Sequence, residues 1–347
     1  MRAVSAVAVL LSLTLLCSPK LYAQQEENSD AQPVFEFHSG FWVNLHHFLY
    51  QQGRVERARA DAGPEQGVSP QYRSFRSIEE LTPQQRVAWN SAVQIYAESW
   101  SSRDLLLNNQ MVLINNRLAE LEDCPELAGR IATECTSGIV PELVTALGEA
   151  APIYRQNWWV EQDRANRAWI AAMAPVLRNM GADLAGELAD IYQSKWPIRI
   201  HVDVVNYAGQ QGAYTSLAPL HVMIASDDSR NRGLSGIETL FYQASHVLAV
   251  GLEQAIEREC RRLQKPVPRD LWNAVLLYTT VERTGRIRAT AQTDADTTSK
   301  AATQANGNTL GARGWGEYDL LLRRYWQPYL DGQVDMDTAV AHLINAI

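Results

Sequence analysis

The spacing of apolar residues changes period near Ile198, and this change constrains the fold of the 347-residue chain more than any other feature. From Ile198 to Val204 every second residue is apolar, which is the pattern of a strand with one buried face. Residues 209–212 predict a turn, and residues 220–225 predict a second strand. Apolar residues recur at helical spacing on both sides of this segment. The order predicts an α+β fold that is predominantly helical, with a small antiparallel sheet.

Start and stop signals bound the helical segments. A first helix is predicted over residues 34–52, followed by a polar loop over residues 53–80. Thr82 and Pro83 read as an N-cap and a proline at the first helical position. Further helices are predicted over residues 83–100 and 102–122, within 141–196 as two or three segments, over 235–263 and 269–288, and over 318–347 with an interruption near Pro328 and Gly332.

The amino terminus has the layout of an export signal. Arg2 precedes an apolar run over residues 3–16, and Leu21-Tyr22-Ala23 resembles a small-residue cleavage site. An uncleaved anchor is the alternative interpretation. We expect a signal peptide over residues 1–23 and a mature chain exported to the periplasm or the extracellular space, with no membrane span. The mature chain divides into a helical region over residues 24–196 and a region over residues 197–347 that holds the sheet; the two are expected to pack as one unit.

Composition and cysteine usage narrow the class of protein. Hydrophobic residues make up 46% and charged residues 20% of the chain, which is an ordinary globular composition. A net charge of −8 without a basic cluster argues against nucleic acid as a partner. In an oxidising compartment, Cys124 and Cys135 are expected to form a local disulfide, and Cys260 is expected to be a buried or partly buried thiol.

Two polar features fall on the predicted C-terminal helices. Glu238, Tyr242 and His246 follow one another at four-residue intervals, so they lie on one helical face. A solvated surface is one interpretation of this face, and a site formed against another layer is the second. On the next helix, Glu282 falls within the apolar stripe, where a carboxylate needs a metal, a cation or several donors. A structural salt bridge is the alternative for Glu282.

The segment Tyr242-Gln243-Ala244-Ser245-His246 resembles the His-Glu-x-x-His motif of zinc metallopeptidases. A glutamate on a helix about three dozen residues later is similar to the ligand order of the gluzincins. More narrowly, the chain resembles a group of secreted bacterial proteins. The similar segments are residues 202–208, 212–215, 237–246, 270–272, 278–282 and 326–330. The resemblance implies a zincin-like core in which two long helices carry the site.

The resemblance also implies a role for each motif position. His246 would be the second metal ligand and Glu282 the third. Tyr242 stands where the first ligand belongs, and Gln243 stands where the general base belongs. An amide cannot take a proton from metal-bound water at neutral pH, so the catalytic set is not intact. Tyr242 and Glu238 remain candidate replacement ligands.

Several other side chains are expected to line a cleft beside the motif helix. They are His46, His47, Tyr214, His221 and Tyr278, and the strand near His221 is expected to border this cleft. The sequence therefore predicts a protein that lacks standard peptidase activity, holds zinc weakly or not at all, and acts by binding a peptide or glycan segment. The alternative is a metal-dependent hydrolase with altered ligands and a base from another segment.

Overall fold

Four strands form a mixed sheet at the centre of the fold, in the order β1-β2-β4-β3. The strands are β1 (Val34–His38), β2 (Arg199–Val205), β3 (Ala213–Leu217) and β4 (Leu220–Ala225). Strands β1, β2 and β4 are parallel, and only β3 runs antiparallel to its neighbour β4. The computed structural model describes residues 34–62, 78–121, 124, 135–291 and 309–347, which belong to one compact unit. The predicted signal peptide lies outside these residues.

The predicted antiparallel sheet is therefore wrong for two of the three strand pairs. The helical segment between β1 and β2 supplies the long crossover that parallel neighbours require. Strand β3 lies on the outer side of β4, so β4 returns beside β2 in the same direction. The predicted helix over residues 34–52 is also wrong at its start. Phe35 and Phe37 alternate with Glu36 and His38, and this period-two segment pairs with β2 as a strand.

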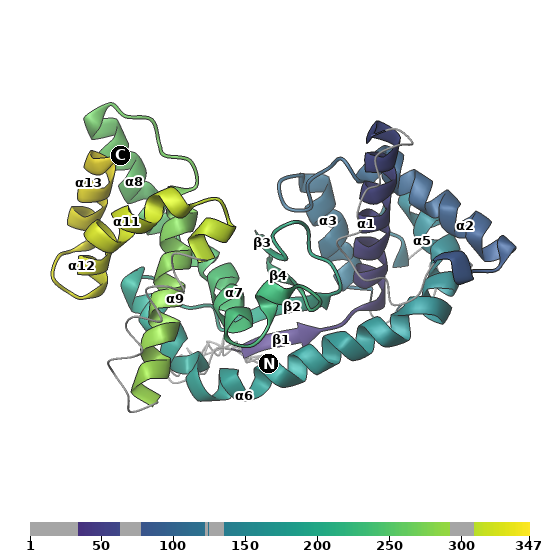
Figure 1. Cartoon of the computed structure of the whole chain (residues 1–347), viewed down its shortest axis with the longest axis horizontal. Coiled ribbons are helices and arrows are strands. Elements are labelled where there is room, and N and C mark those ends of the chain that lie inside the picture. Colours follow the sequence, from purple (N-terminus) through teal and green to yellow (C-terminus); the bar gives the residue numbers. More distant parts are fainter. Residues whose placement is uncertain (1–33, 63–77, 122–123, 125–134, 292–308) are drawn as a thin grey trace, which may run out of the picture. The chain divides into compact units, whose positions relative to one another are not determined.

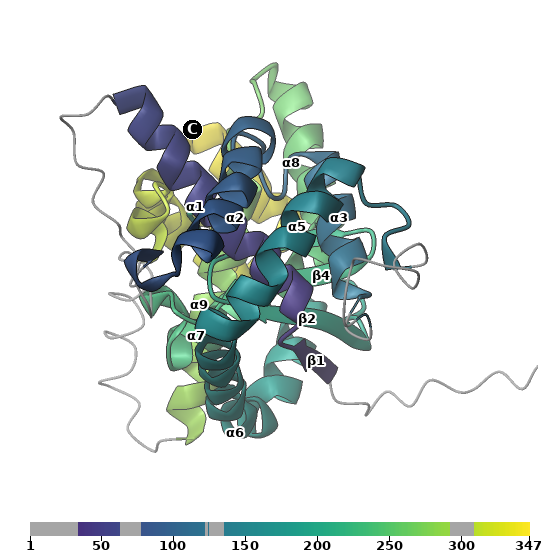
Figure 2. The same ribbon diagram turned by 90° about the vertical axis from the view of Figure 1, so that its right-hand side faces the viewer.

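One group of helices covers the sheet face that carries His201, Asp203 and Val205, since Val205 packs in the core of these helices. This group lies on one side of the sheet in Figures 1 and 2. It comprises α1 (Phe41–Ala62), η1 (Ile78–Glu80), α2 (Pro83–Ile95), the π-helical η2 (Tyr96–Trp100), α3 (Asn109–Ala119) and α5 (Pro141–Tyr154). The predicted N-cap at Thr82 is confirmed as a capping box with Gln85. The predicted loop over residues 53–80 is wrong up to Ala62, where α1 ends. The Cys124–Cys135 disulfide is confirmed. The side chains of Trp42, Trp89 and Trp158 are fully buried in this core.

The second group of helices packs against the opposite face of the sheet. It comprises α7 (Leu234–Ser245), the 3-10 turn η5 (His246–Leu248), α8 (Val250–Leu263), α9 (Leu271–Ala291) and a tail of η6 (Gly316–Tyr318), α11 (Asp319–Leu321), η7 (Leu322–Trp326), α12 (Gln327–Leu330) and α13 (Met336–Ala346). The π-helical η3 (Arg155–Trp159) leads from α5 into α6 (Val160–Ile191), a long helix that contributes to this second core (Figure 1). Cys260 is buried here as a free thiol, as predicted.

The predicted helix over residues 235–263 is interrupted at the motif segment. The Ser245 hydroxyl donates to the carbonyl oxygens of Phe241 at 2.7 Å and Tyr242 at 3.1 Å. Nδ1 of His246 donates to the carbonyl of Tyr242 at 2.9 Å and to that of Gln243 at 3.1 Å. These side chains compete with backbone N–H groups for the carbonyls of the last α-helical turn, which favours an end to the helix. Residues 246–248 consequently form a 3-10 turn before α8 begins.

None of the described helices combines the length and the apolar character needed to cross a bilayer.

Candidate functional sites

A pocket of about 400 Å³ lies beside the motif segment, lined by residues of both hydrophobic cores. Its lining includes Tyr50, Arg54, Leu105 and Tyr214 from one core region and Tyr242, Gln243, His246, Trp272, Asn273, Arg313 and Trp315 from the other. Aromatic walls with a few polar groups are typical of pockets that bind small ligands or peptide side chains. Tyr242, Gln243, His246 and Tyr214 therefore meet at one pocket, although they come from different elements.

His246 presents a neutral imidazole to this pocket. Because carbonyl oxygens can only accept, the two carbonyl contacts place the proton of His246 on Nδ1 and leave Nε2 as an acceptor. Burial lowers the pKa of His246, and the hydrogen bonds to Tyr242 and Gln243 oppose this shift only in part. The ring packs edge-on against Trp272, with 5.4 Å between centroids.

The residues at the other two motif positions are engaged with near neighbours. The hydroxyl of Thr215, on strand β3, donates to Oε1 of Gln243 at 2.7 Å and also to the Gln243 carbonyl at 3.0 Å. The hydroxyl of Tyr242 donates to Oδ1 of Asn273 at 3.1 Å. Burial raises the pKa of Tyr242 to about 12, so the phenol keeps its proton at neutral pH. Neither side chain offers a carboxylate or an anionic ligand.

Arg313 and Arg54 are the two arginines that line the pocket, and Arg313 lies beside the motif segment. Its guanidinium carbon lies 5.1 Å from the centroid of the Tyr242 ring, a cation–π arrangement. Among the described residues no ion pair or hydrogen bond to the Arg313 side chain is found; Asp228, whose charge acts on Arg313, is paired with Arg230 at 2.6 Å. Burial lowers the pKa of Arg313, yet a guanidinium remains charged at any physiological pH. A ligand anion would therefore meet a cation that has no ion pair or hydrogen bond with another described side chain.

The two predicted acidic ligands do not join His246. Asn273 and Trp272 contact His246, whereas Glu282 follows nine residues after Asn273 on the same helix, a rise of about 13 Å. Glu282 lies one turn from Tyr278, where burial and then the Glu282 charge raise the pKa of that tyrosine. Glu238 does not line the pocket. Burial raises the pKa of Glu238 to about 7, with a partial offset from Arg288.

The other predicted cleft residues are also distributed over several surroundings. His46 lies against the Tyr96 hydroxyl at 2.8 Å, and His47 against the Tyr214 hydroxyl at 2.8 Å, both within the helical core. Tyr278 donates to Gln327 at 2.7 Å on the tail side of α9. His221 lies on β4, an interior strand, whereas β3, one of the two edge strands, contributes Tyr214 to the pocket.

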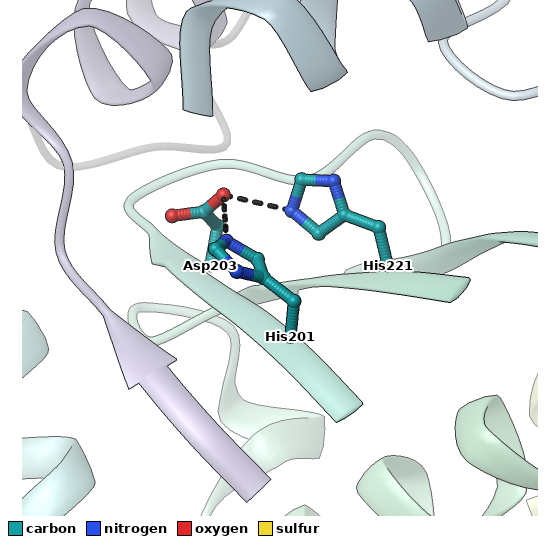
Figure 3. Close-up of side chains that lie close together, drawn as sticks. All are labelled: His201, Asp203 and His221. Carbon is teal, nitrogen blue, oxygen red and sulfur yellow. Dashed lines mark hydrogen bonds and ion pairs between the residues drawn. The ribbon is translucent and has the colours of Figure 1, made fainter. Parts of the chain in front are cut away.

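His221 instead belongs to a cluster on the sheet with His201 and Asp203 (Figure 3). Nε2 of His221 lies 2.7 Å from Oδ2 of Asp203, and Nε2 of His201 lies 3.2 Å from the same oxygen. One ligand atom from each of the three lies within 4.8 Å of the others, so the cluster could hold a metal ion. Burial works against ionisation of Asp203, but the hydrogen bonds and charges of the two histidines lower its pKa to about 2.

Sequence reasoning identified His221 as a cleft residue but did not connect it with His201 and Asp203. The His-x-Asp spacing on a predicted strand places both side chains on one face, which was a usable signal. The pairing of His201 with His221 depends on the register between parallel β2 and β4. No local pattern predicts that register, because β3 lies between β2 and β4 in the sequence.

The motif segment and the sheet cluster differ in how well their donor atoms suit zinc. The motif segment provides one imidazole, a protonated phenol and amides, which is not the set of nitrogen, sulfur and carboxylate ligands that zinc requires. The sheet cluster provides two imidazoles and one carboxylate.

Comparisons with protein-family models, with curated proteins and with solved structures each find no match to this chain.

Proposed function

We propose that the protein is an exported binding protein and that the pocket beside Tyr242, Gln243 and His246 takes a peptide or glycan segment that carries a carboxylate. The zincin-like ancestry implied by the motif accounts for a cleft at this position. The Cys124–Cys135 disulfide supports an oxidising compartment. In this proposal the pocket has retained a ligand-binding role without peptide hydrolysis.

The observation that carries the proposal is the combination of Arg313 with aromatic walls. A guanidinium binds a carboxylate through charge-assisted hydrogen bonds, which are about twice as strong as those between neutral groups. Tyr242, Trp272 and Trp315 provide flat apolar surface beside it. The Nε2 acceptor of His246 and the amide of Asn273 add polar groups that could orient the ligand.

The lack of a carboxylate at the base position of the motif supports binding rather than hydrolysis at this pocket. Hydrolysis in this class of site needs a metal-bound water and a group that removes its proton. Thr215 holds the Gln243 amide at the base position, and Glu282 lies too far along α9 to complete a ligand set with His246. The rival proposal, a hydrolase with altered ligands at the motif segment, would have to draw on Asp104, which lines the pocket but already accepts the backbone N–H groups of Leu106 and Leu107 at its Oδ1.

Isothermal titration with matched ligands tests the proposal. Short peptides with a free carboxyl terminus are compared with the same peptides amidated, and uronic-acid oligosaccharides with neutral ones. We expect the carboxylate form of one class to bind and its neutral form to bind at least about tenfold more weakly, because one charge-assisted hydrogen bond contributes about 1.5–3 kcal/mol. Equal binding of charged and neutral forms would contradict the role of Arg313, and peptide cleavage would contradict the absence of catalysis.

A further inference from the structure

We propose that His201, Asp203 and His221 form a binding site for one divalent cation of the Zn²⁺ type, separate from the pocket at the motif segment. The three side chains come from two parallel strands in the sheet, and none of them lines that pocket. The site therefore does not depend on the zincin resemblance or on the proposed pocket ligand.

The sheet places the three donors on one face by register alone. His201 and Asp203 are two residues apart on β2, so their side chains leave the same face of the strand. His221 is the direct partner of His201 on β4. Figure 3 shows the three side chains on one side of the ribbon, with both imidazoles directed at the same carboxylate. Donors fixed by strand register rather than by loops form a preorganised set.

The distances are close to those of a ligand set around an ion. Ligand atoms about 2.1 Å from a tetrahedral zinc ion lie about 3.4 Å apart. Oδ2 of Asp203 lies 3.2 Å from Nε2 of His201 and 2.7 Å from Nε2 of His221. The first distance is near this spacing, and Nε2 of His221 would have to move about 0.7 Å away from Asp203 to reach it.

Asn116 fixes the orientation of the His221 ring. Nδ1 of His221 lies 2.9 Å from Oδ1 of Asn116. Because an amide oxygen only accepts, this contact places a proton on Nδ1 and directs Nε2 at the Asp203 oxygen, 2.7 Å away. A metal ion bound to Nε2 would replace this direct contact with Asp203, and Asn116 would then hold the ring as the outer partners of metal-binding histidines do.

Oδ1, the second carboxylate oxygen of Asp203, is available to bind a cation. The side chain is 1% exposed, and Oδ1 has no hydrogen-bond partner among the described residues. An unsatisfied buried acceptor is costly to the fold, and a bound cation compensates the carboxylate charge as a whole. Access is available at His201, which is 32% exposed and whose ring stacks on His38 at 4.2 Å between centroids. A water molecule could complete the coordination from this side.

The donor set selects the class of ion. Two imidazoles with one carboxylate suit zinc and the neighbouring transition metals, whereas calcium and magnesium prefer oxygen ligands alone. Arg199 adds a nearby positive charge at the start of β2, but it is paired with Glu36 at 3.3 Å. The charge of Asp203 therefore remains available to a divalent ion.

The test is a titration of the chelator-treated, full-length protein with Zn²⁺, measured by calorimetry. Absorption of bound Co²⁺ serves as a spectroscopic probe of the ligands. The wild-type protein is expected to bind one equivalent of Zn²⁺ that excess Mg²⁺ does not displace. His201→Ala is the lead variant because His201 is partly exposed; Asp203→Asn and His221→Gln keep side-chain size. Each is expected to weaken Zn²⁺ binding by more than the roughly 10–100-fold loss typical of outer-shell changes.

Two matched controls make the result specific. His246→Ala removes the imidazole of the pocket, and His342→Ala removes an exposed histidine of α13; both are expected to leave Zn²⁺ affinity unchanged. Absence of stoichiometric Zn²⁺ binding in the wild type would overturn the proposal, as would equal binding by a folded His201→Ala variant. Loss on His246→Ala alone would assign the metal to the pocket and overturn the sheet site. Carboxylate ligands are left out of these titrations, so failure of the metal site and failure of the pocket remain distinguishable.

Discussion

The motif helix and the sheet cluster each hold a buried carboxyl group, and the two groups have opposite electrostatic surroundings. Asp203 accepts hydrogen bonds from two imidazoles, which lower its pKa to about 2 in spite of burial. Glu238, on α7, has no hydrogen bond or ion pair among the described residues, and burial raises its pKa to about 7. At the carboxyl end of the same helix, Tyr242, Gln243 and His246 each hydrogen-bond to a near neighbour, whereas the three donors of the sheet cluster converge from two strands. Convergence in space, rather than spacing in sequence, marks the place where a cation would be held.

Removal of the Asp203 carboxylate is expected to have the largest effect on stability. Asp203→Ala leaves two inward-facing imidazoles without their acceptor, and breaking a buried charged pair costs about 3–5 kcal/mol. Urea unfolding at pH 7 measures the loss. Asp203→Asn keeps one acceptor oxygen and should lose less. A loss below about 1 kcal/mol for Asp203→Ala would show that the cluster does not depend on the carboxylate as a centre.

The variant Glu238→Gln is expected to stabilise the protein, and only at neutral to alkaline pH. The pKa of Glu238 is about 7 in the folded protein and 4.5 as its ordinary value, so the folded state binds the proton more tightly. Stability from this group is full below pH 4.5, falls as pH rises towards 7, and stays low above it. A difference of 2.5 pH units corresponds to at most about 3 kcal/mol. Unfolding at pH 4 and at pH 8 should show no gain at the lower pH and a gain at the higher; an equal gain at both would contradict burial as the cause.

Arg313→Met is expected to weaken binding of a carboxylate ligand by about 10–100-fold, because a charge-assisted hydrogen bond contributes about 1.5–3 kcal/mol. The apolar replacement keeps a long side chain against Tyr242. Calorimetry with the charged and neutral ligand pair measures the change. Arg324→Met, on the tail segment η7, is the matched control because its guanidinium lies over Tyr325 and not in the pocket. Equal losses for the two variants would indicate a general charge effect.

Restoring the motif is expected to have the smallest effect. In a His201→Ala background, the double change Tyr242→His and Gln243→Glu supplies the first ligand and the base, but Glu282 remains about 13 Å along α9 from the level of His246. Zinc affinity at the pocket should rise by less than about tenfold, as two imidazoles without a third ligand form an incomplete site. A tight new site would show that Glu282 or Glu238 reaches the pocket and that the gluzincin geometry is preserved.

The sequence predicted those parts of the fold that have local signals. Thr82 and Pro83 marked the start of α2, and the alternation from Ile200 to Val204 marked β2. The same kind of alternation at Phe35 and Phe37 was overlooked because Phe37, Phe41 and Leu45 also fit a helical period. Strand β3 lies between the predicted turn over residues 209–212 and the predicted strand over residues 220–225 and was not itself predicted, since a five-residue edge strand carries little pattern of its own.

The candidate sites show the same limit more sharply. Tyr242, Gln243 and His246 all line one pocket. The three belong to one short segment, and its place in a helix could be predicted from the sequence. Whether His246 meets Glu282 depends on which turns of the two helices lie against each other. Packing at Trp272 and Asn273 determines this. His201 and His221 become neighbours only through the register of β2 with β4. Neither helix level nor register is encoded in residue spacing.

Anomalous scattering at the zinc edge, from crystals of the chelator-treated protein soaked with Zn²⁺, tests most directly whether zinc binds at the sheet cluster rather than at the pocket beside His246. The account predicts one strong peak bounded by Nε2 of His201, Nε2 of His221 and a carboxylate oxygen of Asp203, each at about 2.0–2.2 Å. A peak at Nε2 of His246, with the sheet cluster empty, would contradict it.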